Sequence, residues 1–168
     1  MKGYNTDKNI LVTGGAGFIG SHLAQALIKQ GHEVVVVDNL STGKRERVPE
    51  KAQFVEGDIR QMAALPLPKS IDAVFHLAAQ MDVRHSVKEP AFDASVNVEG
   101  TVAVLHYAMN AGAKKVIFSS SGGAIYGPCE QIPTPETTAC QSTSPYCVSK
   151  YSAEQYVRLY ARLHQLPY

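Results

Sequence analysis

The sequence lacks an excess of charge of either sign, with 16 lysine and arginine residues against 15 aspartate and glutamate residues. It therefore has no basic surplus of the kind that nucleic-acid-binding domains show, and its densest cationic patch, Lys44-Arg45-Glu46-Arg47, is interpreted as a solvated loop. No apolar run is long enough to cross a bilayer, and residues 1–8 lack the apolar stretch of a signal peptide. We therefore expect no nucleic-acid partner and no membrane association.

Cysteine is scarce, and the histidines are scattered. The three cysteines, Cys129, Cys140 and Cys147, show no paired metal-ligand spacing, which predicts free thiols in a reducing cytoplasm. The six histidines form no HExxH or similar cluster. The sequence thus predicts a cytoplasmic protein without a metal site.

Hydrophobic residues make up 45% of the 168 positions, enough for the core of one globular domain. Short β-rich runs alternate with helical runs. The predicted strands are 9–13, 33–37, 53–56, 73–77 and 115–118, and the predicted helices are 18–30, 94–111 and 145–164. Gly31 and Gly112 follow two of these helices as C-terminal caps, and 119–144 is predicted to be a loop. This order predicts an α/β fold over 1–168, a Rossmann-like doubly wound parallel sheet.

A glycine-rich turn joins the first strand to the first helix. Gly15, Gly17 and Gly20 fit the pattern GxGxxG, and Gly14, Gly17 and Gly20 fit GxxGxxG. Such glycines allow a sharp turn, a close approach of backbone to a pyrophosphate, and tight packing of helix on strand. The helix N-terminus then offers N–H groups to the phosphates. A lone motif of this kind is weak evidence, but its position between a strand and a helix favours a dinucleotide site.

Two aspartates follow the next strands. Asp38, directly after Val37, is placed to accept hydrogen bonds from ribose hydroxyls and to repel a 2′-phosphate, which favours NAD over NADP. Arg45 and Arg47 keep NADP as a minority interpretation. Asp58 follows the third strand, where its side chain reaches toward an adenine amino group or caps a helix.

Tyr146 and Lys150 lie four residues apart, on one face of the last predicted helix. By spacing alone, an exposed helical pair is the simpler interpretation. A free tyrosine is a poor base at neutral pH because its pKa is about 10, but a nearby ammonium group favours the phenolate. The pair therefore also fits a catalytic phenol supported by a lysine.

Taken together, the motifs resemble those of the extended short-chain dehydrogenases/reductases, and most closely the UDP-glucose (UDP-galactose) 4-epimerase subgroup. The motifs that carry the resemblance are Gly14-Gly15-Ala16-Gly17-Phe18-Ile19-Gly20, Asp38-Asn39-Leu40, Gly57-Asp58-Ile59, His76-Leu77-Ala78-Ala79-Gln80, Asn97, Ser119-Ser120-Ser121, Tyr126-Gly127 and Tyr146-x-x-x-Lys150. They cover nearly the whole chain in the correct order.

The resemblance implies NAD as cofactor and a UDP-hexose as substrate. It implies pyrophosphate contacts from Gly14, Gly17, Phe18, Ile19 and Gly20, adenosine contacts from Asp38, Asn39, Asp58 and Ile59, and contacts along the cofactor from Leu77, Ala78, Ala79 and Gln80. Asn97 and Ser119 would support the nicotinamide half, and Ser121, Tyr146 and Lys150 would be catalytic, with Ser120 as the alternative to Ser121. Tyr146 and Lys150 would also contact the cofactor.

This chain departs from the family pattern at two places. Cys147 stands where a glycine often follows the tyrosine, and a thiol there is small enough to preserve the helix start. If exposed, it would make the site oxidisable. Gly122-Gly123 lengthen the serine loop by one residue.

The reaction type follows from a missing carboxylate. Dehydratases and decarboxylases of this family resemble Thr-Asp-Glu or Thr-Ser-Glu before the Tyr-Gly pair, whereas this chain has Ser121-Gly122-Gly123-Ala124-Ile125. An epimerase is therefore preferred over a dehydratase, and a dehydratase, decarboxylase or reductase of the same family is the alternative.

Members of the family continue past this length with two more strands and a smaller lobe that holds the nucleotide-sugar. The resemblance therefore implies an NAD-binding part that lacks this lobe, leaves the fifth strand as an exposed sheet edge and is inactive alone. It also implies a homodimer through 94–111 and 145–164, with Val98, Val102, Leu105, Met109, Tyr156, Leu159, Tyr160 and Leu163 as candidate contacts or core. The alternative is a stand-alone NAD-binding or interaction module.

Overall fold

A computed structural model of the chain describes residues 8–168. Residues 1–7 lie outside the described residues. The prediction that the N-terminal segment is not a signal peptide falls mostly on these residues, and so does the start of the predicted 1–168 domain. The strands are β1 Asn9–Thr13, β2 Glu33–Asp38, β3 Gln53–Glu56, β4 Ala73–His76 and β5 Lys115–Phe118. The helices are α1 Phe18–Lys29, α2 Val83–Lys88, α3 Pro90–Ala94, α4 Gly100–Asn110, α5 Gly122–Tyr126 and α6 Pro145–His164, with 3₁₀ turns η1 Arg45–Arg47 and η2 Ile59–Ala64 and a π-helical segment η3 Ser95–Glu99.

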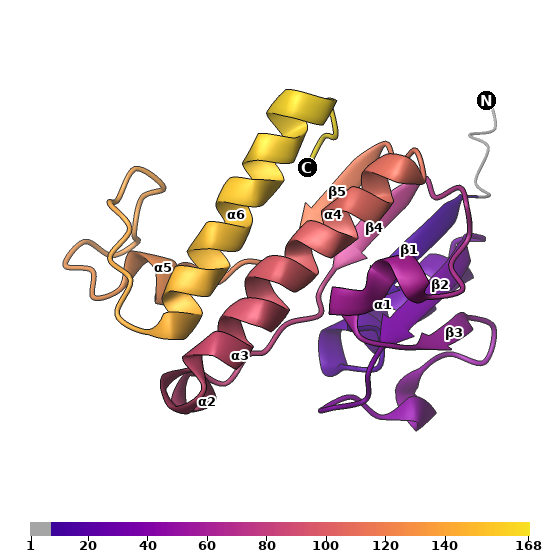
Figure 1. Cartoon of the computed structure of the whole chain (residues 1–168), viewed down its shortest axis with the longest axis horizontal. Coiled ribbons are helices and arrows are strands. Elements are labelled where there is room, and N and C mark those ends of the chain that lie inside the picture. Colours follow the sequence, from indigo (N-terminus) through magenta and orange to yellow (C-terminus); the bar gives the residue numbers. More distant parts are fainter. Residues whose placement is uncertain (1–7) are drawn as a thin grey trace.

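The five strands form one parallel sheet in the order β3-β2-β1-β4-β5 (Figure 1). The register is continuous across the sheet, since Val12 of β1 pairs with Val36 of β2 and with Phe75 of β4. This is the strand order of the first five strands of a Rossmann fold, in which β2 and β3 are added on one side of β1, and β4 and β5 on the other. The predicted α/β fold class is confirmed.

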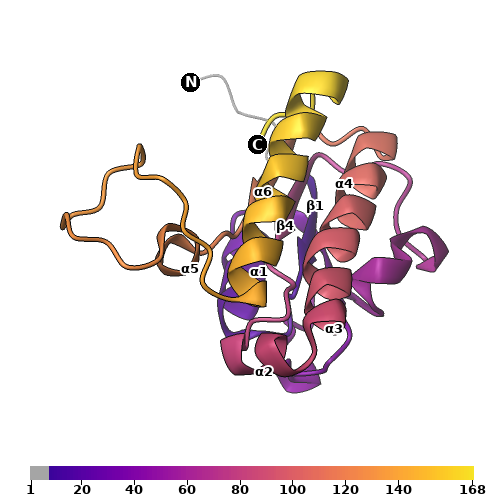
Figure 2. The ribbon, with the colours of Figure 1, turned by 60° about the vertical axis from the view of Figure 1, so that its left-hand side comes forward.

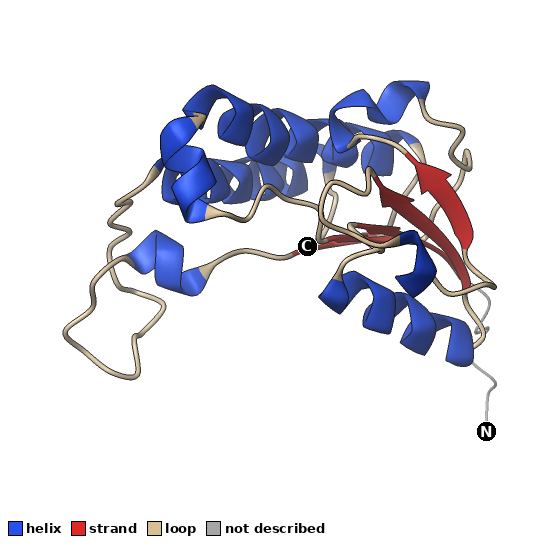
Figure 3. Cartoon of the chain, turned by 90° about the horizontal axis from the view of Figure 1, so that it is seen from below, coloured by secondary structure: helices blue, strands red, loops and turns tan. Residues whose placement is uncertain are grey.

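Helices cover both faces of the sheet (Figure 3). On one face, Ile10, Val12, Val34 and Val36 pack with Ala24 and Leu27 of α1. On the other face, Leu11, Val35, Val37 and Val74 pack with Val104, Leu105 and Ala108 of α4 and Val157 of α6. β2 reads Glu-Val-Val-Val-Val-Asp without alternation because both of its faces are buried in this way.

Several predicted helix ends are confirmed. Gly31 and Gly112 have φ angles of +89° and +71°, the left-handed conformation that terminates a helix. The last helix begins at Pro145 and ends at His164, as the sequence predicts, and the Ser144 hydroxyl caps it by accepting a hydrogen bond from the Cys147 N–H at 3.3 Å.

The predicted single helix over 94–111 is wrong in its start and in its regularity. The helical path begins at Pro90 in α3, continues through η3, and ends at Asn110 in α4. Proline at the first helical position explains the earlier start. The short helix α2 was not predicted, and α5 lies inside the segment predicted to be a loop.

β5 is the edge strand of the sheet, as predicted, and the end of the chain covers this edge in part. The end of the chain lies beside β5, where the Val116 N–H donates to the Pro167 carbonyl oxygen at 2.8 Å and Leu166 is buried. α4 and α6 run side by side over the same face of the sheet, and the segment that carries α5 projects away from it (Figure 2). Within residues 8–168, none of the helices combines the length and apolar character that crossing a bilayer requires.

Candidate functional site

Two glycines of the first turn are required by the fold itself. Gly14 has a φ of +72°, and a Cβ there would lie 2.7 Å from the Ala78 backbone nitrogen. A Cβ on Gly20 would overlap the carbonyl oxygen of Gly14 and lie 2.7 Å from the Gly15 Cα. These glycines allow the turn to close tightly between β1 and α1.

Gly17 is different, because its backbone conformation does not require glycine and a Cβ there would meet a single atom, the Gly14 carbonyl oxygen. Its φ is −76°, and the nearest heavy atom to a Cβ there is 3.2 Å away. As the N-cap of α1, it offers no side-chain cap, and the first turn of α1 contains no acidic residue. Phe18 and Ile19 at this end are 72% and 64% exposed. The N–H groups of this helix start fit an anion such as a pyrophosphate.

Asp38 at the end of β2 faces the glycine turn. One carboxylate oxygen accepts the Ala16 N–H at 3.0 Å, and the other accepts the Leu40 N–H at 2.8 Å. The carboxylate is therefore locked in orientation, and each oxygen keeps a further acceptor position. Asp38 is 8% exposed, since the following loop folds over it and Lys44 N–H donates to the Ala16 carbonyl oxygen at 3.0 Å.

Two of the three cationic side chains of this loop, Lys44 and Arg45, have partners within the loop and β3. The Arg45 guanidinium lies 4.4 Å from the centre of the Phe54 ring, and Lys44 forms a 3.9 Å ion pair with Glu46. Arg45, one of the two residues that kept NADP open, thus stacks on β3.

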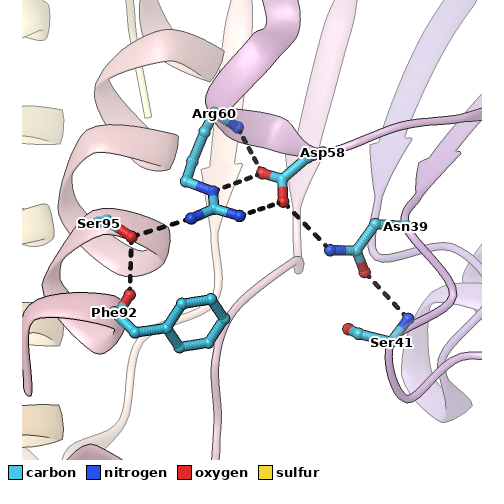
Figure 4. A network of polar contacts seen from close by, with 6 residues as sticks. All are labelled: Asn39, Ser41, Asp58, Arg60, Phe92 and Ser95. Atoms are coloured by element: carbon cyan, nitrogen blue, oxygen red, sulfur yellow. Dashed lines mark hydrogen bonds and ion pairs between the residues drawn. The ribbon is translucent and has the colours of Figure 1, made fainter. Parts of the chain in front are cut away.

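Asp58 is a helix N-cap, one of the two roles predicted for it, because its carboxylate accepts the Arg60 N–H at 2.9 Å. The same carboxylate binds the Arg60 guanidinium in a bidentate pair and accepts a 3.3 Å hydrogen bond from the Asn39 amide (Figure 4). The hydrogen bonds from Arg60 hold the pKa of the Asp58 carboxyl below its usual value. The neighbouring Ile59 is buried.

The segment after β4 continues along the same sheet edge. Leu77 N–H donates to the Thr13 carbonyl oxygen at 3.1 Å, and Gln80 exchanges two hydrogen bonds with Asn97, each of 2.9 Å. Leu77, Ala78, Ala79 and Gln80 are all half-buried. Asn97 is 2% exposed and lies in the π-helical segment, a distortion that is frequent at functional sites.

A buried carboxylate that sequence reasoning missed ties this segment to α6. Asp93 is fully buried and accepts hydrogen bonds from the Gln80 amide at 2.7 Å and the Ser149 hydroxyl at 2.5 Å. Asn97 also donates to Asp93, at 3.2 Å. The only signal in the sequence is the i, i+4 spacing of Asp93 and Asn97, and the predicted helix start at 94 falls between them.

His76 is buried at the end of β4 and is held as a neutral imidazole. The Thr101 hydroxyl donates to the Asn97 carbonyl oxygen at 2.7 Å, so it accepts from His76 Nε2 at 3.0 Å. His76 Nδ1 then accepts from the Thr13 hydroxyl at 2.7 Å. Burial, with a smaller effect from Lys150, lowers the pKa of His76 to about 3. The ring therefore joins β1, β4 and α4 without taking up a proton at neutral pH.

Lys150 extends from α6 to the end of β5. Its Nζ donates to the Ser119 carbonyl oxygen at 2.7 Å and lies 4.1 Å from the centre of the Phe118 ring. The residue is 4% exposed. Burial lowers its pKa to about 8, opposed by the negative charges of Glu154 and Asp93, so the ammonium form predominates at neutral pH.

Tyr146 lies one turn before Lys150 and is half-buried. Its backbone N–H donates to the buried Ser86 hydroxyl at 3.1 Å, which fixes the start of α6 against α2. Of the two candidate serines, Ser121 is half-buried at the N-cap of α5. Ser120 instead lines a cavity of about 300 Å³ together with side chains of β5 and α6 and with Tyr168.

Cys147 is 3% exposed, so its thiol is not at the surface. Burial raises the pKa of this thiol, but hydrogen bonds with Ser144 and Thr143 outweigh that effect and leave it below its ordinary value. The helix start is intact around it. Among residues 8–168, no group of three His, Cys, Asp or Glu side chains is arranged to hold a metal ion.

The chain is similar in sequence to known proteins. The sequence profile described as "NAD dependent epimerase/dehydratase family" matches residues 10–168. A UDP-glucose 4-epimerase of Mycolicibacterium smegmatis is 42% identical over 163 residues, which cover 93% of this chain and 52% of that protein. The chain spans about half the length of the curated relatives it matches.

Solved structures agree. The Thermotoga maritima UDP-glucose 4-epimerase with UDP-glucose matches with a TM-score of 0.86 and 48% identity, over 94% of this chain and 52% of that one. The Thermus thermophilus UDP-glucose 4-epimerase complex with NAD matches with a TM-score of 0.85 and 40% identity, over the same shares. The profile match, the relatives and the sheet order agree that the chain belongs to the NAD-dependent epimerase/dehydratase family and is homologous to the N-terminal part of UDP-glucose 4-epimerases.

Proposed function

We propose that this chain binds NAD along the carboxyl edge of its sheet and supplies the catalytic groups of a UDP-glucose (UDP-galactose) 4-epimerase. The observation that carries the proposal is the position of Lys150. Its ammonium group reaches the backbone that follows β5, one helical turn from Tyr146. The uncapped α1 N-terminus and Asp38 follow β1 and β2 at the same edge.

The residues of this edge fit the parts of NAD. The pyrophosphate would be contacted by Gly14, Gly17, Phe18, Ile19 and Gly20. The adenosine would be contacted by Asp38, Asn39, Asp58 and Ile59. The remainder of the cofactor would be contacted by Leu77, Ala78, Ala79, Gln80, Asn97, Ser119, Tyr146 and Lys150. The spare acceptor positions on Asp38 suit two ribose hydroxyls and would repel a 2′-phosphate. With Arg45 stacked on Phe54, this favours NAD over NADP.

The chemistry follows from three side chains. The Tyr146 phenolate would take the proton of the sugar 4-hydroxyl and later return it, supported by the Lys150 ammonium. The Ser121 hydroxyl would orient that hydroxyl group. NAD held by the residues of this edge would supply reversible hydride transfer at C4 of the sugar. A positioned proton-transfer group typically contributes about 10²- to 10⁴-fold in rate.

An epimerase is favoured over a dehydratase because α5 carries no carboxylate. Its sequence, Gly-Gly-Ala-Ile-Tyr, follows Ser121 directly. Acid–base elimination of water would need a titratable group at this point, and Ser121 with Tyr146 supplies only what an alcohol oxidation needs.

We also propose that two copies associate through α4 and α6. Leu163 and Tyr156 on α6 are 62% and 39% exposed, large values for apolar side chains on one helix. Leu105, by contrast, is 1% exposed and belongs to the core, so it is not part of this surface.

The function is tested in two steps. Isothermal titration of this chain with NAD should show binding, and a Tyr146→Phe variant should bind NAD within about twofold of wild type, since only the hydroxyl is removed. For turnover, the C-terminal half of the Thermotoga maritima relative is joined after Tyr168. Tyr146→Phe should then lower UDP-galactose epimerisation by about 10²- to 10⁴-fold.

The outcomes separate the alternatives. Persistent epimerisation by the Tyr146→Phe fusion would refute the assigned base. NAD binding without turnover in the unmodified fusion would favour a stand-alone NAD-binding module.

A further inference from the structure

The adenosine end of the site contains a carboxylate whose acceptor positions are nearly all used by one arginine. One oxygen of Asp58 accepts the Arg60 backbone N–H and Nε–H, both at 2.9 Å. The other oxygen accepts the Arg60 Nη2–H at 2.7 Å and the Asn39 amide at 3.3 Å. A carboxylate has about four acceptor positions, so these four hydrogen bonds occupy it.

Arg60 is itself anchored on a second element (Figure 4). Its Nη1–H donates to the Ser95 hydroxyl at 3.1 Å, and that hydroxyl donates to the Phe92 carbonyl oxygen at 2.9 Å. The guanidinium also lies 5.4 Å from the centre of the Phe92 ring. The planar fork of Arg60 is therefore held between η2 and the α3–η3 helix, which fixes the plane of the Asp58 carboxylate.

One of the four hydrogen bonds is replaceable. The Asn39 contact is the longest, and it comes from a side chain whose oxygen is held separately by the Ser41 N–H at 3.1 Å. A ligand N–H that displaces Asn39 gains an acceptor that is already oriented. A ligand carbonyl oxygen at the same place meets an ionised carboxylate and is repelled.

We propose that Arg60 is a positioning residue that orients the Asp58 carboxylate for a 6-amino purine and so makes the site prefer adenine to hypoxanthine. The inference rests on the proposed NAD binding. Adenine presents an amino group at the position where hypoxanthine presents a carbonyl oxygen. Selectivity between the two bases is thus set by a residue that contacts neither of them.

The experiment measures the affinity of this chain for NAD and for nicotinamide hypoxanthine dinucleotide by isothermal titration. We expect wild type to prefer NAD by about tenfold or more, the worth of one hydrogen bond to a charged group. Arg60→Gln should bring the ratio of the two affinities to about one, chiefly by weakening NAD. Arg60→Lys should restore the ratio only in part, because an ammonium group cannot form the bidentate pair.

Two further variants serve as controls. Ser95→Ala removes only the second anchor and should lower the ratio less than Arg60→Gln does. Arg162→Gln, at an exposed arginine near the end of α6, should leave the ratio unchanged. Melting temperatures of all variants establish that they are folded.

The failures are distinguishable. Equal weakening of both dinucleotides by Arg60→Gln, or an unchanged ratio, would overturn the role of Arg60 while leaving NAD binding in place. No binding of NAD by wild type would overturn the proposed function and this inference together.

Discussion

At the scale of single residues, Lys150 is an ionisable group that folding removes from water. The folded protein holds its pKa at about 8, against an ordinary value of 10.5. Between these two values the unfolded chain binds a proton that the folded chain does not. The free energy of unfolding therefore rises with pH in this window, by about 3 kcal/mol in total if the shift acts in full.

The rise of the unfolding free energy with pH can be tested by comparing wild type with a variant that lacks Lys150. The unfolding free energy of wild type minus that of Lys150→Met should rise by about 3 kcal/mol between about pH 7 and about pH 10.5, measured by urea denaturation. Lys88→Met, at an exposed lysine of α2, is the matched control, and its difference from wild type should stay flat. A flat profile for Lys150→Met would show that the lysine is more hydrated than its 4% exposure indicates.

Residues inside sequence motifs were easier to predict than their partners. Asp38 is the last residue of β2 and Asp58 lies two residues past β3, so their positions at the sheet edge could be predicted from spacing. Asp93 and Ser149 are 56 residues apart in sequence, and their hydrogen bond exists only because α3 packs on α6. Arg60 likewise needs η3 beside η2 before its guanidinium has two partners.

At the scale of elements, the β1–α1 turn contains two kinds of glycine. Gly20 is needed for the fold, since a Cβ there collides with backbone of the same turn. Gly17 has an ordinary φ, and a Cβ there would meet the Gly14 carbonyl oxygen at 3.2 Å, a tight contact that a small shift relieves. The fold therefore requires glycine less strictly at position 17 than at position 20.

Substitution by alanine should affect stability at Gly20 and NAD binding at Gly17. Gly20→Ala should destabilise the chain by about 2 kcal/mol or more because the turn must open. Gly17→Ala should keep stability within about 1 kcal/mol, yet weaken NAD binding by about tenfold, equivalent to ~1.4 kcal/mol. Thermal unfolding and isothermal titration measure the two effects. If Gly17→Ala binds NAD as wild type does, the pyrophosphate does not approach this residue.

The helix predicted over 94–111 has a different start in the structure and contains a π-helical turn. The 94–111 pattern was correctly taken as helical, but Pro90 starts the helix four residues earlier and the turn at 95–99 is widened. The widening places Asn97 where it can bond both Gln80 and Asp93. Periodicity in a sequence does not reveal one extra residue in a turn.

At the scale of the whole molecule, the exposed apolar side chains of α6 favour pairing with a second copy. Leu163→Glu should shift the proposed dimer toward monomer in sedimentation velocity, because a charge would be placed in an apolar contact. Ile132→Glu, at an 87% exposed isoleucine outside α4 and α6, is the matched control. A monomeric wild type at about 100 μM would contradict the dimer.

The sequence alone determined the order of the five strands and of the long helices, the glycine turn, and the one-turn spacing of Tyr146 and Lys150, because each depends on residues close together in the chain. Tertiary structure decided the protonation of His76, the burial of Asp93 and Lys150, the anchoring of Asp58 by Arg60, and the hydrogen bond of β5 to Pro167. These depend on which atoms surround a group, and desolvation and hydrogen bonding act only after distant segments have packed together.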